Sequence, residues 1–151
     1  MVTISKSTIH ENVHQTIYSL INSITGLTGK VYAEFPELSL QAQNSKSSYP
    51  VVIINSSDLD NWEGLTLKKL KISGRIAIEL YNTSAKDSDW YASDIIDKIE
   101  TSVNSLRNDG LKSIMLDSEN KDVVQRGKIN VHVKTLTFSF EFIFNRSSLS
   151  Y

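Results

Sequence analysis

The stretch GKINVHVKTLTFSFEFIF, residues Gly127–Phe144, contains no proline and only its leading glycine. Apolar and polar side chains alternate along it, which is typical of a β-strand with one buried face. Fully extended, these 18 residues would reach about 60 Å, whereas a compact domain of 151 residues has a radius of gyration of only about 15 Å. We therefore expect this strand to bend, to project or to pair with something outside its own sheet. That surplus length favours an assembling protein over an enzyme.

The alternation changes phase within this strand. Its apolar residues are Ile129, Val131 and Val133 on one phase, then Leu136, Phe138, Phe140, Phe142 and Phe144 on the other. A bulge near Lys134–Thr135 would swing the strand from one surface to another. Because the phenylalanines are too apolar to face water, we assign them to the core of the subunit. Gly127–Val133 is then predicted to lie on the intersubunit side, in an arm with Leu65–Ile72 as its antiparallel partner.

Composition places the chain among ordinary globular proteins. At 151 residues, with 40% hydrophobic and 22% charged residues, we expect a single domain spanning residues 1–151. Lys and Arg total 16 and Asp and Glu total 17. The net charge is therefore close to zero and does not indicate binding to nucleic acid or to a membrane. The absence of cysteine excludes disulfides, thiolate metal sites and cysteine nucleophiles. No signal-peptide pattern and no apolar run of about 20 residues is present, which predicts no membrane span.

Two amphipathic helices are predicted, at about Thr8–Thr25 and at about Ser88–Asn108. Their apolar stripes are Ile9, Val13, Ile17, Leu20 and Ile24 in the first, and Tyr91, Ile95, Ile99, Val103 and Leu106 in the second. Thr8 and Glu11 have capping-box spacing at the start of the first helix. Oxygens of the Asp87-Ser88-Asp89 run are expected to cap the second helix.

The remaining segments predict further strands and loops. Strands are expected at Gly29–Glu34, Tyr49–Asn55, Leu65–Tyr81 and Leu111–Leu116, with a bulge or bend at Gly74 and a turn region at Ser56–Gly64. The polar stretches Phe35–Ser48 and Asp117–Arg126 are expected to be loops that are mobile or ordered by a partner. Short connections favour antiparallel neighbours. The fold class is therefore α+β: a mixed or antiparallel sheet, two amphipathic helices packed on one face, and a long β-hairpin arm.

The sequence HENVH at residues 10–14 has the HExxH spacing of zinc proteases. Histidines four residues apart share one helix face and can bind one zinc ion, with the glutamate as general base. A catalytic zinc needs a further protein ligand, and the remaining histidine, His132, is isolated in the last strand. We therefore expect no metal role for His10, Glu11 and His14, which we interpret as residues at the boundary of the apolar stripe. No glycine-rich phosphate loop or GxSxG elbow is present either, so we expect no enzymatic activity and no cofactor.

Several residues are candidates for a subunit or partner interface. A short basic run is formed by Lys68, Lys69 and Lys71 with Arg75. It indicates either a solvated strand face or a rim that contacts an acidic partner. Trp62 and Trp90 lie off the apolar stripes, where a tryptophan either anchors an interface or closes the core. The candidate interface residues are Trp62, Lys68, Lys69, Lys71, Lys128, Val131 and Val133.

The order of these segments resembles the tail terminator (tail completion, head-tail joining) proteins of tailed bacteriophages. The resemblance covers nearly the whole chain and rests on five pieces in sequence: IHENVHQTIYSLINSI, GKVYAEFP, YPVVIIN, RIAIELYNTSAKDSDWYASDIIDKIETSVNSL and KINVHVKTLTFSFEFIFNR. It is a pattern of elements, with no catalytic fingerprint. Related neck, adaptor and tail-tube proteins share parts of it.

The resemblance implies a homo-oligomeric ring, expected to be a hexamer, in the tail or neck of a virion and assembled in the host cytoplasm. Such a ring would cap the tail tube protein on one side and meet the head-completion or connector protein on the other. DNA would pass through its lumen without sequence-specific binding, and a balanced net charge suits a lumen that must let DNA slide. Two alternatives remain open: another small phage neck, adaptor or tail-tube-associated structural protein, and a zinc hydrolase that uses His10, Glu11 and His14.

Overall fold

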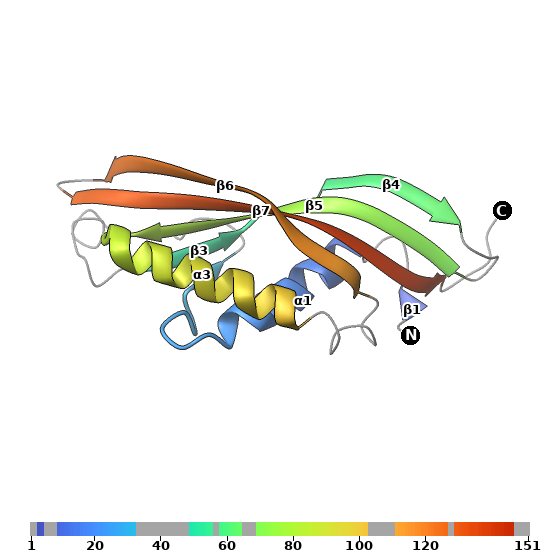
Figure 1. The fold of residues 1–151 in the computed structure, drawn as a ribbon. Helices are drawn as coiled ribbons and strands as arrows, with labels where there is room; N and C mark the ends of the chain where they lie inside the picture. The colour runs from blue at the N-terminus through green and yellow to red at the C-terminus, as the bar shows by residue number, and fades with distance from the viewer. Residues whose placement is uncertain are drawn as a thin grey trace.

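The computed structural model describes residues 3–4, 9–32, 49–55, 58–64, 69–102, 111–126 and 129–146. The elements in chain order are β1 (Thr3–Ile4), α1 (Ile9–Asn22), β2 (Val31–Tyr32), β3 (Val51–Ile54), β4 (Asp58–Gly64), β5 (Lys69–Asn82), α3 (Ala85–Thr101), β6 (Leu111–Arg126) and β7 (Ile129–Arg146). The strands form one mixed sheet of seven strands, and both helices lie on the same side of it (Figure 1). The predicted α+β class, a mixed sheet with two helices on one face, is confirmed, and the long hairpin of the sheet is formed by β6 and β7.

The sheet is built on two long central strands, β5 and β7. They pair antiparallel without a register shift from Lys69 opposite Asn145 to Asn82 opposite His132. The other edge of β7 is occupied by β6 and then by β1, and the other edge of β5 by β3 and then by β4. One end of this pair, together with β4, extends past the helices (Figure 1). Projection beyond the helical layer is therefore how the subunit accommodates the length of its last strand.

The main core lies between the sheet and the helices. Even-numbered residues of β5 and β7 face this side, because successive residues of a strand point to opposite faces. The largest fully buried side chains there include Ile72, Ile76, Ile78, Leu80, Phe138 and Phe142 from the strands and Ile17 and Ile21 from α1. The expected apolar stripes of both helices are largely confirmed, since Val13, Ile17, Ile24, Ile95 and Ile99 are all buried.

A second apolar cluster lies on the opposite face of the sheet. Its buried members are Tyr49, Val51, Ile53 and Val131, with Tyr32, Tyr81 and Ile129 packed against them. This cluster explains the phase change in the last strand, and the predicted bulge near Lys134 is wrong. The strand continues in register, and its Ile129–Val133 end has apolar residues on the face opposite the helices. Polar residues take the helix-facing positions at that end, so the apolar residues move from one face of the sheet to the other without a bulge.

The predicted partner of this end is also wrong. Ile129–Val133 pairs with Val124 and its neighbours in β6 and with Tyr81 at the end of β5. The first residues of β5, Lys69–Ile72, pair instead with Phe142–Asn145 at the far end of β7. Antiparallel pairing of two long strands in one continuous register requires the start of one to meet the end of the other.

Residues 117–126, predicted to be a mobile loop, belong to strand β6. Their backbone pairs with β7 from Ser118 opposite Thr137 to Arg126 opposite Ile129. Register shifts occur between Leu111 and Ser113 and between Leu116 and Ser118. Most side chains of this segment are exposed, as is common for an edge strand, where charged residues discourage pairing with other chains. The polarity of the segment therefore reflects its place at the edge of the sheet.

Three other predictions differ from the structure: the start of the second helix, the turn region around Trp62 and the bulge at Gly74. Helix α3 begins three residues earlier than predicted, because Ser84 is its N-cap and accepts a hydrogen bond from the Asp87 backbone N–H at 3.3 Å. The predicted turn region around Trp62 is the strand β4, paired with β5. Its register shift, between Leu59 and Asn61, lies opposite Gly74, while β5 itself runs on through that glycine. The predicted loop at 35–48 lies outside the described residues.

Gly26 allows the end of α1 to approach α3. Its φ of +91° lies in the left-handed region that glycine adopts without strain. A Cβ at this position would lie 2.6 Å from the hydroxyl oxygen of Tyr91 in α3. Both the backbone conformation and the close approach therefore require glycine here.

We expect an aspartate at Val131 to destabilise the subunit as strongly as one at Phe140. The side chains are 0% and 2% exposed, respectively, and burying an unpaired carboxylate costs several kcal/mol. Thermal unfolding of Val131→Asp and Phe140→Asp, followed by circular dichroism, measures this. Asn130→Asp is the matched control, because Asn130 is exposed next to Val131. A Val131→Asp variant that melts like the wild type would contradict a structural role for the second cluster.

Candidate functional site

The Lys134 cluster, formed by Lys134, Asp89, Glu119 and Lys121, joins the β6–β7 hairpin to helix α3. The Lys134 ammonium lies 2.6 Å from a carboxylate oxygen of Asp89 on α3 and 2.5 Å from one of Glu119 on β6. Lys121 reaches the same Asp89 oxygen at 3.6 Å. The cluster therefore links three separate elements, β7, β6 and α3, through one buried cation.

Lys134 is the most buried member of this cluster. Its side chain is 8% exposed, against 49% for Asp89 and 36% for Glu119. Burial disfavours the charged ammonium, but hydrogen bonds to Asp89 and Glu119 and their negative charges outweigh it and raise the pKa of Lys134. The hydrogen bond from Lys134, reinforced by the charges of Lys134 and Lys121, lowers the pKa of Asp89 below that of an ordinary aspartate.

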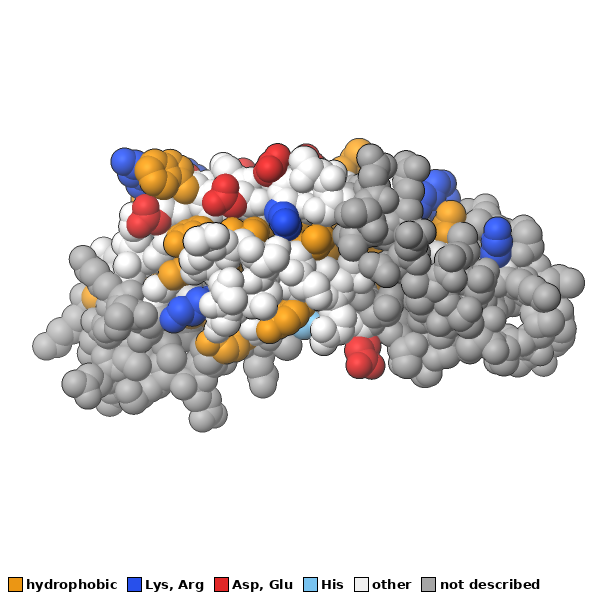
Figure 2. Space-filling model, turned by 90° about the horizontal axis from the view of Figure 1, so that it is seen from below, with side chains coloured by type: hydrophobic (Ala, Val, Ile, Leu, Met, Phe, Trp, Pro, Cys, Tyr) orange, Lys and Arg blue, Asp and Glu red, His pale blue; other side chains and the backbone are white. Residues whose placement is uncertain are grey.

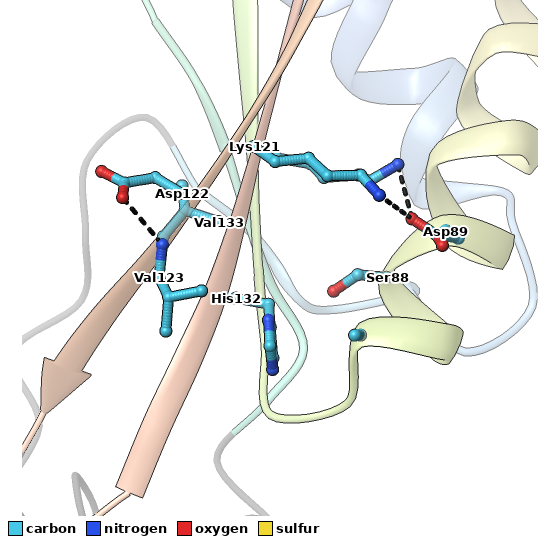
Figure 3. Close-up of a pocket in the computed structure, with 9 residues that line it drawn as sticks. Ser88, Asp89, Lys121, Asp122, Val123, His132 and Val133 are labelled. Atoms are coloured by element: carbon cyan, nitrogen blue, oxygen red, sulfur yellow. Dashed lines mark hydrogen bonds and ion pairs between the residues drawn. The ribbon is translucent and has the colours of Figure 1, made fainter.

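An open hollow of about 480 Å³ lies beside the cluster, between the first turn of α3 and the hairpin (Figure 3). It is lined by Ala85, Ser88 and Asp89 of α3, by Lys121, Asp122 and Val123 of β6, and by His132, Val133 and Lys134 of β7. Figure 3 shows the Asp122 carboxylate turned away, where it accepts a hydrogen bond from the Val123 backbone N–H at 2.8 Å. The hollow therefore combines apolar walls with a hydroxyl, an imidazole and a balanced set of charges.

The outer face of the sheet, opposite the helices, carries charged residues and small polar ones in its projecting half, including Lys71, Ser73, Arg75, Ser139 and Glu141. Glu141 of β7 is shared between Lys71 of β5 at 3.5 Å and Lys112 of β6 at 3.6 Å. A shallow hollow of about 380 Å³ lies beside this ion-pair group, with Met115, which is 61% exposed, at its edge. No helix covers this sheet face in the described part of the chain, so it offers a surface for a second protein layer.

Helix α3 carries the most exposed large hydrophobic residue among those described. Trp90 is 62% exposed, and the Lys86 ammonium lies 4.8 Å from the centroid of its ring. Elsewhere on the helix side of the molecule, hydrophobic side chains form small separate groups between polar ones (Figure 2). An exposed tryptophan in such surroundings is typical of an interface anchor.

The structure places the predicted interface residues in different parts of the subunit. Lys69 is exposed and Lys71 half-buried on β5, while Val131 and Val133 are buried in the subunit. Trp62 lies in β4, where its backbone pairs with Ile72, and the structure does not describe its side chain. Lys68 and Lys128 lie outside the described residues. The described members do not form one site, and their role in an interface remains a prediction.

Sequence reasoning missed Lys134 and Asp89. One signal was available: Lys134 has the same parity as the buried phenylalanines, so a lysine occupies a helix-facing position. The sequence does not identify the partner of Lys134, because Asp89 lies far from it in the chain and fits a capping position at the start of the second helix. Trp90, by contrast, is exposed and does not close the core, and its role as an interface anchor remains a prediction.

The HExxH residues lie in the first turns of α1. Glu11 is exposed, and the half-buried His14 stacks on Tyr18 with ring centroids 6.4 Å apart. The side chain of His10 is not described. Within the described ranges, no group of three or more His, Asp or Glu residues could hold a metal ion.

We expect the purified protein to contain no stoichiometric zinc. The reason is that two histidines on one helix face supply only part of a zinc coordination shell. Elemental analysis of the wild type and of His14→Ala tests this. Zinc bound at one ion per chain and lost in His14→Ala would restore the metal interpretation.

We expect Lys134→Met to lower stability most strongly near neutral pH, because it removes the buried cation that Asp89 and Glu119 share. Asp89 has a lowered pKa, so its contribution is present above about pH 3.9 and is lost as the pH falls through the folded-state value. Lys134 has a raised pKa, so its contribution is present below about pH 10.4 and is lost only as the pH rises through its folded-state value. The stability gap between wild type and variant should therefore narrow in acid.

Urea unfolding between pH 3 and pH 9 measures that gap. Lys121→Met is the matched control, because the Lys121 side chain is 70% exposed and lies farther from Asp89. A gap that stays constant across the acid range would contradict the assigned ion pairs.

Comparison with known proteins adds a likeness of fold. The sequence matches no known family and no curated protein. Among solved structures, the fold is similar to that of a chain in the virion of a native gene transfer agent (GTA) particle, with a TM-score of 0.57 and 12% sequence identity. The similarity covers 83% of this chain and 91% of that chain. This chain therefore shares its architecture, over nearly the full length of the other chain, with a protein of a virion.

Proposed function

We propose that this protein is a structural component of a virion, and specifically a tail terminator that joins a phage tail to its head. The likeness to a chain of the gene transfer agent virion carries this proposal, because it spans 83% of this chain and 91% of that chain. The resemblance of the sequence to tail terminators points in the same direction and supplies the finer role.

The subunit has features that suit a ring. Helices cover one side of the sheet, whereas the projecting half of the outer face is polar and open, so a neighbouring subunit could cover it. A contact between two different surfaces of identical subunits closes into a ring when the rotation between them allows. We propose a hexamer that meets the tail tube protein on one side and the head-completion or connector protein on the other, at the tail or neck of the particle.

The same proposal assigns the protein no catalytic activity and no metal or cofactor. DNA would pass through the lumen of the ring without sequence-specific contacts, which the net charge of −1 suits. No helix in the described ranges is long and apolar enough to cross a membrane. Exposed Trp90 and the basic residues Lys69 and Lys71 are the proposed contacts to neighbouring proteins.

A second candidate is another small neck, adaptor or tail-tube-associated protein of a phage. The fold likeness supports it equally, since the likeness does not specify a position in the particle. The two candidates differ in assembly: a terminator forms a closed ring at the end of a tail tube, whereas an adaptor can act as single subunits.

We expect the purified chain to form closed rings, most simply hexamers, alone or when mixed with assembled tail tubes. Light scattering and negative-stain electron microscopy under both conditions measure this. Terminal rings on tubes would support the terminator, and rings or single subunits bound elsewhere on the particle would support the adaptor. A monomer in both conditions would contradict the proposed ring.

A further inference from the structure

The hollow between α3 and the β6–β7 hairpin lies at the N-terminus of a helix. Helix α3 is 17 residues long and starts after its N-cap Ser84, and Ala85 in its first turn lines the hollow. The first amides of a helix have no carbonyl partner within it, and the helix dipole places partial positive charge there. Such an end attracts groups that accept hydrogen bonds and carry negative charge.

Ser88 supplies a second, independent indication of a ligand. Its side chain is 1% exposed, yet its hydroxyl oxygen has no hydrogen-bond partner in the described structure. Figure 3 shows this hydroxyl pointing from α3 into the hollow, towards the strand that carries His132. Buried polar groups are nearly always hydrogen-bonded, because an unmade bond leaves their lost hydration uncompensated. The Ser88 hydroxyl is therefore available to donate a hydrogen bond to, or accept one from, whatever occupies the hollow.

The two ammonium groups beside the hollow already have carboxylate partners, and one of them is loosely held. Asp89 and Glu119 are offset by Lys134 and Lys121, and the Asp122 carboxylate turns away to its own backbone. Lys121 holds Asp89 only at 3.6 Å, and its side chain is 70% exposed, so it can reach a ligand as well. The helix end adds partial positive charge beside these pairs.

The walls of the hollow are apolar beside these donors. Ala85, Val123 and Val133 line it, and Val123 is 55% exposed although it is a large hydrophobic residue. A ligand that covered Val123 would remove apolar surface from water. An occupant should therefore combine a short apolar stem with an oxygen that accepts hydrogen bonds.

We propose that this hollow binds a carboxylate carried on a short apolar stem, with the Ser88 hydroxyl and the Lys121 ammonium as donors and Val123 against the stem. A glutamate side chain of a docking peptide and a small organic acid both present this chemistry. The site is independent of the proposed role in the virion, since it requires only the folded subunit.

Methyl NMR on the full-length chain tests this site at any oligomer size. Valine methyl groups are labelled, and the signals of Val123 and Val133 are identified with Val→Ile substitutions. Two carboxylates are titrated: butyrate as the small acid, and a blocked tripeptide with a central glutamate as the peptide. Butyramide and butylamine are titrated as the neutral and cationic counterparts of butyrate. We expect butyrate or the tripeptide to shift Val123 and Val133 in a saturable way, while core Val13 and Val52 stay unchanged.

Ser88→Ala should weaken carboxylate binding at least about tenfold, the ratio expected when a hydrogen bond to a charged group is lost. Ser93→Ala is the matched control, since Ser93 is an exposed serine on the same helix and should bind as the wild type does. Tighter binding of the tripeptide would identify a peptide ligand, and tighter binding of butyrate a small acid. The proposal is overturned if neither compound shifts Val123 and Val133 at tens of millimolar, if butylamine binds equally well, or if Ser88→Ala binds unchanged.

Discussion

The other elements of the subunit are arranged around the continuous antiparallel pairing of β5 with β7. Their backbone pairing extends from Lys69–Asn145 to Asn82–His132 without interruption. A single register of this length fixes which residues face the helices and which face outward, because a shift by one residue would exchange the two faces. The main core, the second cluster and the polar outer surface all follow from that one alignment. It also carries both strands beyond the helical layer, where their ends and β4 form the projecting half of the sheet.

At the end of the sheet that the helices cover, the ion pairs of buried Lys134 connect the β6–β7 hairpin to α3. The Lys134 side chain is only 8% exposed, and burying its positive charge without a partner would be strongly unfavourable. The carboxylates of Asp89 and Glu119 compensate for this desolvation. Replacing such a cluster with apolar residues is often no worse for stability, so its value here lies in geometry. It holds the edge strand β6 and the start of α3 in fixed positions. The adjoining hollow, with the Ser88 hydroxyl directed into it, depends on that arrangement.

The surfaces left open by the fold suit assembly with other proteins. The helices cover one side of the sheet, and the projecting half of the other side carries charged and small polar residues. Trp90 stands on the outward side of α3 at 62% exposure, where it is available to a partner. The likeness to a virion chain, at 12% sequence identity, is a likeness of fold.

The sequence by itself determined the fold class, the two helical stripes and the assignment of Phe138, Phe140 and Phe142 to the core. Those features depend on local periodicity, which is readable wherever a segment has one buried face. Tertiary structure alone decided the rest. Asp117–Arg126 is a strand because β7 pairs with it, although its own side chains remain polar at the sheet edge. Val131 is buried and Lys134 lies inward because both faces of β7 are covered at one end, which a pattern based on one buried face cannot describe. The partners of Lys134 and the hollow beside Ser88 arise where segments distant in sequence meet, and no local pattern encodes that meeting.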